Sequence, residues 1–224
     1  MTMICISFKT LSLWLAALAC LVVPARAEVV LSNLTVTDTD ANDVSLNPWI
    51  AQSFVTNSQA WTLTSATLFF KAYNTSGNLF VNLYSNATDV PGSSLGTLSG
   101  SDNPASEGQY TYTSTGISLA PSTAYWLVAG VSSGDGSYGW FYDYTGSITS
   151  TGVWSIPSTN TYAVTTDGGG SWGSYDGLPL LFSIEATATS PSPVPEIDPT
   201  SLGSVLALVL GSLGLLERRR LKAA

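Results

Sequence analysis

The sequence predicts an all-β protein, an antiparallel β-sandwich of jelly-roll type with about nine or ten strands. Three observations predict this fold. The central part of the chain is dominated by Thr, Ser, Gly, Val, Tyr and Trp, its apolar residues alternate with polar ones, and turn-forming sequences recur about every 8 to 12 residues. No helix start signal precedes an apolar repeat of helical period in this part. Short strands joined by tight turns bury their apolar faces when two sheets stack.

Four segments show the alternation most clearly, and they cover residues 66–71, 79–84, 109–113 and 180–187. Every second residue in each segment is apolar, so one face of each strand is expected to point into the core and the other toward solvent. Turn sequences such as Asp167-Gly-Gly-Gly170 separate the segments. The β-sandwich is therefore predicted to span residues 28–187.

The N-terminal residues 1–27 have the pattern of a secretory signal peptide. Lys9 precedes an apolar stretch at residues 11–23, and Ala25 and Ala27 form a small-x-small cleavage site. Both cysteines of the chain, Cys5 and Cys20, lie in this leader, so the mature chain has neither disulfide nor thiolate chemistry. A lipoprotein leader, in which a lipidated Cys20 becomes the N-terminus, is the alternative.

Two segments follow the predicted sandwich. Residues 188–195 form a linker rich in Thr, Ser and Pro, which would extend to about 25 Å. Residues 194–224 then combine three parts in order: the motif Val194-Pro195-Glu196-Ile197-Asp198-Pro199, an apolar run, and a basic cluster made of Arg218, Arg219, Arg220 and Lys222.

The apolar run at residues 200–216 is predicted to be one transmembrane helix. Its length as a helix is about 25 Å, close to the short limit for a bilayer core of about 30 Å. The basic cluster is a stop-transfer signal that keeps the tail cytoplasmic and leaves the sandwich outside.

This C-terminal arrangement resembles the tripartite sorting signal of bacterial PEP-CTERM proteins, in the VPEID-type variant, because Ile197 stands where a second Pro is usual. The resemblance implies a bacterial host and an exosortase-type membrane transpeptidase as a partner that processes the signal. It also implies export to the cell envelope or the extracellular space, with membrane anchoring that is at least transient.

The body of the chain is similar to the choice-of-anchor R domain, a secreted bacterial β-sandwich. The similarity rests on Ala51-Gln-Ser-Phe54, Trp61 to Leu68, Leu79 to Tyr84, Pro91-Gly92-Ser93 and Leu119 to Trp126, which follow one another in the order of that domain. It implies an extracellular location and a sandwich fold. It assigns no activity to any residue.

The predicted mature body is strongly acidic. Residues 28–195 contain twelve Asp and Glu residues against one basic residue, Lys71, for a net charge of −11, whereas the whole chain carries −8. Such a surface repels phosphate backbones, so nucleic-acid binding is excluded, and it keeps an exported protein soluble.

Enzyme chemistry has few groups to work with, and the protein is expected not to be an enzyme. The chain has no His, and the body has no Cys, so zinc sites of His/Cys type are excluded. A Ser nucleophile would find a conventional base only in Lys71, which is expected to be solvated. A pair of acids acting as a glycosidase is the alternative to acids that only solvate loops.

No cofactor is expected, and calcium is the one alternative. Asp38, Asp40, Asn42 and Asp43 begin like a calcium loop, with oxygen ligands at alternate positions. The EF-hand pattern fails because Asp43 stands at the glycine position and Trp49 at the bidentate acid position. The interpretations are therefore a calcium site of another type or a solvated acidic loop.

An aromatic row is the candidate ligand-binding feature. As a strand, residues 138–144 project four rings to one face, with Asp143 opposite: Tyr138, Trp140, Tyr142 and Tyr144. Such rows stack on sugar rings, and Trp172 and Tyr175 would add a wall. Core packing between the sheets is the competing interpretation. The sequence thus predicts an exported, non-catalytic cell-surface or extracellular-matrix protein, with a carbohydrate-binding module that contacts extracellular polysaccharide as the alternative.

Overall fold

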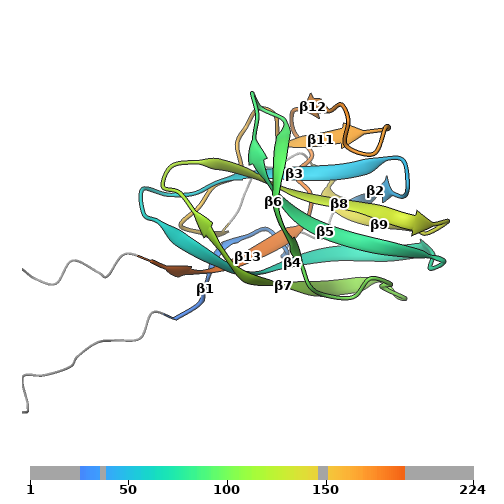
Figure 1. Cartoon of the computed structure of the whole chain (residues 1–224), viewed down its shortest axis with the longest axis horizontal. Helices are drawn as coiled ribbons and strands as arrows, with labels where there is room; N and C mark the ends of the chain where they lie inside the picture. The colour runs from blue at the N-terminus through green and yellow to red at the C-terminus, as the bar shows by residue number, and fades with distance from the viewer. Residues whose placement is uncertain (1–25, 36–38, 146–150, 190–224) are drawn as a thin grey trace, which may run out of the picture. The chain divides into compact units, whose positions relative to one another are not determined.

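Thirteen β-strands and no helix make up the part of the chain that the computed structural model describes, residues 26–35, 39–145 and 151–189 (Figure 1). All of these residues belong to one unit, residues 1–189. Within these ranges no helix is long and apolar enough to cross a membrane. Ala25, the sorting motif at 194–199, the apolar run at 200–216 and the basic cluster lie outside the described residues.

The strands form two antiparallel sheets, which confirms the predicted β-sandwich class. The first sheet has the order β10-β1-β13-β4-β9-β2, with β7 also paired to β4. Its strands are β1 (Glu28–Ser32), β2 (Thr39–Val44), β4 (Trp61–Asn74), β7 (Gly108–Leu119), β9 (Ser137–Asp143), β10 (Thr151–Gly152) and β13 (Phe182–Ala188).

The second sheet has the order β12-β11-β3-β8-β5-β6. Its strands are β3 (Trp49–Val55), β5 (Gly77–Asn86), β6 (Pro91–Leu98), β8 (Ala124–Gly134), β11 (Tyr162–Thr165) and β12 (Gly173–Tyr175). Figure 1 shows β3, β8 and β5 running beside one another. Neighbours in both sheets are often far apart in sequence, so the chain crosses repeatedly between the two layers.

The four segments with clear alternation are strands, as predicted, and their apolar residues point inward. In β4, for example, Ala66, Leu68 and Phe70 are buried while Thr67 and Lys71 are partly exposed. The strand count exceeds the prediction, in part because β10 and β12 have only two and three residues. Strands this short are held by their neighbours' backbone hydrogen bonds and leave no periodic pattern in the sequence.

The long strand β4 organises the first sheet. One of its edges pairs with β7, from Trp61 opposite Leu119 to Phe70 opposite Gly108. Its other edge pairs first with β13 and then with β9, so that β9 begins its pairing where β13 leaves. Strand β9 is thereby drawn into the interior of the sheet, between β4 and β2.

Two buried amides fix the backbone where the chain enters β13. The side chain of Gln52 accepts a hydrogen bond from the Leu180 amide (2.6 Å) and donates to the carbonyls of Thr161 (2.8 Å) and Ser53 (2.9 Å). The side chain of Asn33 donates to the Leu180 carbonyl and accepts from the Phe182 amide, both at 2.8 Å. Every polar atom of these two buried amide groups therefore has a partner, as burial requires.

Candidate functional site

The aromatic row of β9 lies mostly inside the sandwich. Tyr138 and Trp140 have no exposed surface, Tyr142 is half-buried, and only Tyr144, after the end of the strand, is exposed. The Tyr138 hydroxyl donates to the Gly77 carbonyl (2.9 Å), and the Trp140 Nε1–H donates to the Leu181 carbonyl (3.0 Å). The structure therefore supports core packing for Tyr138 and Trp140 in place of a flat exposed row, because this face of β9 packs against residues of the second sheet.

The predicted calcium ligands are also separated. Asp38 lies outside the described residues, and Asp40, Asn42 and Asp43 belong to strand β2. Because side chains alternate along a strand, Asp40 and Asn42 share one face and Asp43 points to the other. Asp43 accepts a hydrogen bond from the Ser137 hydroxyl at 2.6 Å. Among the described residues no group of three or more His, Cys, Asp or Glu side chains could hold a metal ion. From Thr39 onward the segment interpreted as an acidic loop is an edge strand.

Lys71, the only basic residue of the predicted mature body, lies on the outer face of the first sheet. Its Nζ stands 5.0 Å from the centroid of the Tyr73 ring and 5.3 Å from that of Phe141. Hydrogen bonding to Tyr73 raises the pKa of Lys71, and this effect outweighs the opposing desolvation. A lysine that acts as a general base needs a lowered pKa, because it must first lose its proton. The raised pKa of Lys71 favours the protonated form instead.

The outer face of the second sheet carries a different set of side chains. In β5 the residues Leu79, Val81 and Leu83 are buried in the core. The intervening positions point away from the core and alternate amide with aromatic side chains: Asn78, Phe80, Asn82, Tyr84 and Asn86. We call these five residues, together with the outward-facing Trp49, Trp126 and Trp172, the amide–aromatic face.

The rings of this face pack over a floor of small side chains. Ala51, Val128 and Ala163 form that floor on β3, β8 and β11, and all three are buried. Trp49, Phe80, Tyr84 and Trp172 pack against it and remain partly exposed. The rings of Trp49 and Phe80 meet edge to face at a centroid distance of 4.8 Å, a favourable geometry for aromatic pairs. Trp126 lies beneath, with its Nε1–H donated to Asn86 at 2.8 Å.

Trp49 can lie this close to the sheet because its indole ring packs against two glycines, Gly130 and Gly169. A Cβ at Gly130 would lie 2.5 Å from two atoms of the indole, and one at Gly169 would lie 2.8 Å from a third. Gly169 also has a positive φ of 91°, which favours glycine. The Gly-rich loop after β11 therefore folds over Trp49.

The Asp167 carboxylate holds that loop in place. It accepts hydrogen bonds from the Thr165 hydroxyl (2.6 Å), the Ser171 hydroxyl (2.6 Å) and the Ser171 amide (2.9 Å). These bonds, led by the one from the Ser171 hydroxyl, hold the pKa of Asp167 well below its usual range. Folding lowers this pKa, so the stabilisation is complete at neutral pH and is lost only as the pH falls below the ordinary range of a carboxylate.

Replacing this carboxylate is expected to loosen the loop over Trp49. In Asp167→Ala the three hydrogen bonds disappear, so acrylamide should quench the tryptophan emission more strongly than in the wild type, with little change in the melting temperature. Glu107→Ala, which removes an exposed acid elsewhere, is the control and should leave quenching unchanged. Equal quenching in Asp167→Ala and the wild type would show that the carboxylate does not order the loop.

Two polar atoms of the amide–aromatic face lack partners. Asn82 Oδ1 and Trp49 Nε1 are both covered and have no hydrogen bond to any described residue. The neighbouring amides differ, since Asn86 accepts from Trp126 and Asn78 donates to the Ser133 hydroxyl at 3.1 Å. One acceptor and one donor without partners are therefore covered by the side chains of this face.

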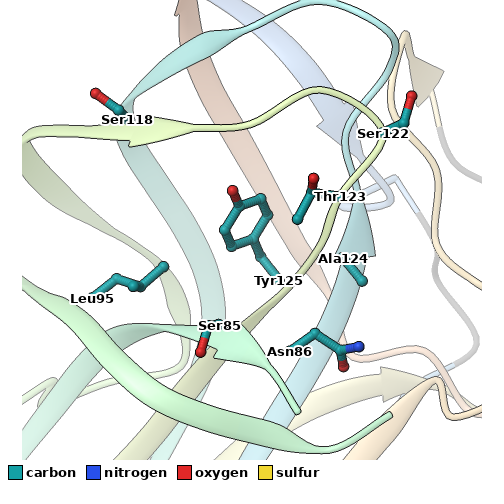
Figure 2. Close-up of a pocket in the computed structure, with 8 residues that line it drawn as sticks. All are labelled: Ser85, Asn86, Leu95, Ser118, Ser122, Thr123, Ala124 and Tyr125. Atoms are coloured by element: carbon teal, nitrogen blue, oxygen red, sulfur yellow. The ribbon is translucent and has the colours of Figure 1, made fainter. Parts of the chain in front are cut away.

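A pocket of about 510 Å³ opens at the Asn86 end of β5. Figure 2 shows the Tyr125 ring in the middle of it, with the Leu95 side chain pointing toward that ring. Its lining is uncharged and mostly hydroxylated: Ser85, Asn86, Leu95, Ser118, Ser122, Thr123, Ala124 and Tyr125. Asn86 belongs both to this lining and to the amide–aromatic face, so the two features meet at that residue.

Comparisons with known proteins find only distant structural likeness. No family model matches the chain, and no curated protein matches it. Among solved structures, the cysteine protease and lectin-like domains of a surface layer associated protein of Clostridium difficile align with 8% identity and a TM-score of 0.47, over 73% of this chain and 36% of that one. The infectious bursal disease virus Gx strain aligns with 11% identity and a TM-score of 0.30, over 83% of this chain and 51% of that one.

A subviral particle of the same virus aligns with 13% identity and a TM-score of 0.32, over 87% of this chain. This chain therefore spans 36% of the length of the bacterial structure and about half of each viral one. At these scores the likeness does not extend to function.

Proposed function

We propose that this chain is an exported, non-catalytic protein of the cell surface or the extracellular matrix. In this proposal residues 1–27 direct secretion, the acidic sandwich acts outside the cytosol, and residues 194–224 anchor it until an exosortase-type transpeptidase processes the signal. The resemblance of the C-terminus to PEP-CTERM signals and of the body to choice-of-anchor R domains supports the export route.

The state of Lys71 is the structural observation that supports the non-catalytic part. It is the only base in the predicted mature body, and its raised pKa and its position between two rings keep it protonated. Among the described residues the acids are also dispersed, without a group of three or more. These two observations support a role in binding over one in acid–base catalysis.

Mass spectrometry of the mature protein from its native cell tests the export route. We expect an N-terminus at Glu28 and a C-terminus that lacks the residues after the sorting motif. Deleting residues 194–224 should change where the protein is found and leave the melting temperature of the sandwich unchanged. An intact chain in the soluble interior of the cell, with both ends uncut, would contradict the proposal.

Carbohydrate binding is a second candidate function, and the amide–aromatic face favours it. Aromatic rings stack on the apolar faces of sugars, and amide groups bond their hydroxyls. The sequence predicted sugar binding by the aromatic row of β9, but most of that row lies in the core. The corresponding feature on the solvent side is the face built on β5.

A further inference from the structure

We propose that the amide–aromatic face binds a neutral polysaccharide that runs along β5. This inference rests on the second candidate function and adds to it the location of the site, the charge class of the ligand and the direction in which the ligand lies. Nothing in it depends on residues 1–25 or 190–224.

The alternation along β5 supplies both interactions that a sugar chain uses. Asn78, Asn82 and Asn86 each carry a planar amide with a donor side and an acceptor side. Asn78 already donates to Ser133 and Asn86 already accepts from Trp126, which leaves the Asn78 oxygen and the Asn86 nitrogen for neighbouring hydroxyls. Phe80 and Tyr84 stand between them as ring surfaces that remain partly exposed. Aromatic side chains with a small number of placed polar groups are the usual composition of ligand sites.

Asn82 is the centre of the proposed site. It stands between the two rings of β5, and its Oδ1 has no partner among the described residues. Because this Oδ1 is covered, a ligand hydroxyl reaches it only when the Asn82 side chain turns outward, and the bond then satisfies an acceptor that has no partner in the free protein. Trp49 Nε1 is likewise covered and without a partner among the described residues.

The charge of the surroundings selects a neutral ligand. The eight residues of the face include no Asp, Glu, Lys or Arg, and the nearby Asp167 carboxylate is occupied by Thr165 and Ser171. The body as a whole carries −11 at residues 28–195, so polyanions such as uronate polymers are repelled. A polysaccharide without charged groups is not repelled by this net negative charge.

The length of the face favours a chain of sugars over a single one. Tyr84 lies four positions after Phe80 along the strand, which corresponds to about 13 Å. That distance exceeds the width of one hexose ring, so two stacking contacts need at least two sugar units. At the far end of β5, Asn86 also belongs to the lining of the uncharged pocket.

Affinity electrophoresis of the purified full chain tests the proposal. The chain is kept in a detergent without a sugar headgroup, and the native gels contain hydroxyethylcellulose, dextran or galactomannan, with alginate as the anionic comparison. We expect at least one neutral polymer to retard the wild type and alginate to have no effect. The change Asn82→Ala should weaken retardation at least tenfold with an unchanged melting temperature, because Asn82 Oδ1 has no partner to lose.

Tyr84→Ala is the second variant, and it should weaken retardation by a similar factor. Tyr73→Ala is the matched control: it removes a tyrosine that is 55% exposed on the outer face of the other sheet, and it should bind as the wild type does. Melting temperatures of all three variants separate lost binding from lost folding.

Each of the other outcomes contradicts a different part of the proposal. If neutral polymers retard the wild type and both β5 variants equally, the site lies elsewhere and this inference fails while carbohydrate binding stands. If no polymer retards the folded wild type, both fail. Retardation by alginate alone would show that the ligand class is wrong.

Discussion

Replacing Trp140 with alanine is expected to lower the free energy of unfolding by about 3–5 kcal/mol, the usual range for a buried tryptophan. The Trp140 side chain has no exposed surface, packs beside Phe70 with ring centroids 5.8 Å apart, and donates to the Leu181 carbonyl. The variant leaves a large cavity in the core, and the Leu181 carbonyl keeps only its longer hydrogen bond from the Phe69 amide, at 3.3 Å. Urea denaturation followed by circular dichroism measures the change.

Tyr144→Ala is the matched control for this variant, because Tyr144 comes from the same aromatic row and is 68% exposed. Its effect should lie within about 0.5 kcal/mol of zero, as for most surface substitutions. If Trp140→Ala left stability unchanged and abolished polysaccharide retention, the ring would be a surface contact and the core assignment of β9 would be wrong.

Gln52→Ala is expected to have the second largest effect, a loss of about 3 kcal/mol or more. The variant leaves the buried Leu180 amide without its partner, which costs about 1–3 kcal/mol. It also removes the bonds to the carbonyls of Ser53 and Thr161, although the Thr161 carbonyl still accepts from the Ser53 amide at 3.0 Å and the Ser53 hydroxyl at 2.8 Å. It also opens a cavity between the sheets, since Gln52 has no exposed surface. Thermal and urea denaturation should agree on the loss.

Asn82→Ala provides the comparison, since it removes an amide whose Oδ1 makes no hydrogen bond. It should cost little stability where Gln52→Ala costs much. Equal losses in the two variants would show that side-chain volume, and not the hydrogen bonds at Leu180, accounts for the effect.

The sequence predicted the class of the fold well because alternation records burial directly. In β5 the residues Leu79, Val81 and Leu83 alternate with polar and aromatic ones, and the structure places the three in the core. The same strand contained the candidate site, since an amide or an aromatic ring occupies each of the other positions from Asn78 to Asn86. That alternation is the sequence feature from which the candidate site could have been predicted.

The aromatic row of β9 shows where such patterns stop being informative. Alternation separates two faces of a strand, but a face made of Tyr and Trp suits both the core and a sugar. The choice depends on β9 pairing with β4 beyond the end of β13, a contact between residues far apart in sequence. The same holds for β2, whose acids looked like a loop until pairing with β9 made them a strand.

The order in which the strands pair could not be predicted from the sequence either, because it involves single polar contacts between residues that are far apart in the chain. Gln52 meets Leu180, and Asn33 meets Phe182, through side chains that any turn-rich sequence contains in number. Neither the hydropathy of these residues nor their spacing identifies the partner.

The pairing of β13 has a mechanical consequence. This last strand is hydrogen-bonded along both edges, to β1 from Glu28 opposite Ala186 and to β4 as far as Ala188 opposite Trp61. Tension applied at the C-terminal end of β13 and directed along its axis would load these hydrogen bonds in shear. Many bonds would then bear the force together, whereas in an unzipping geometry they would break one after another. The domain is therefore built to withstand drag at the end from which the linker leaves.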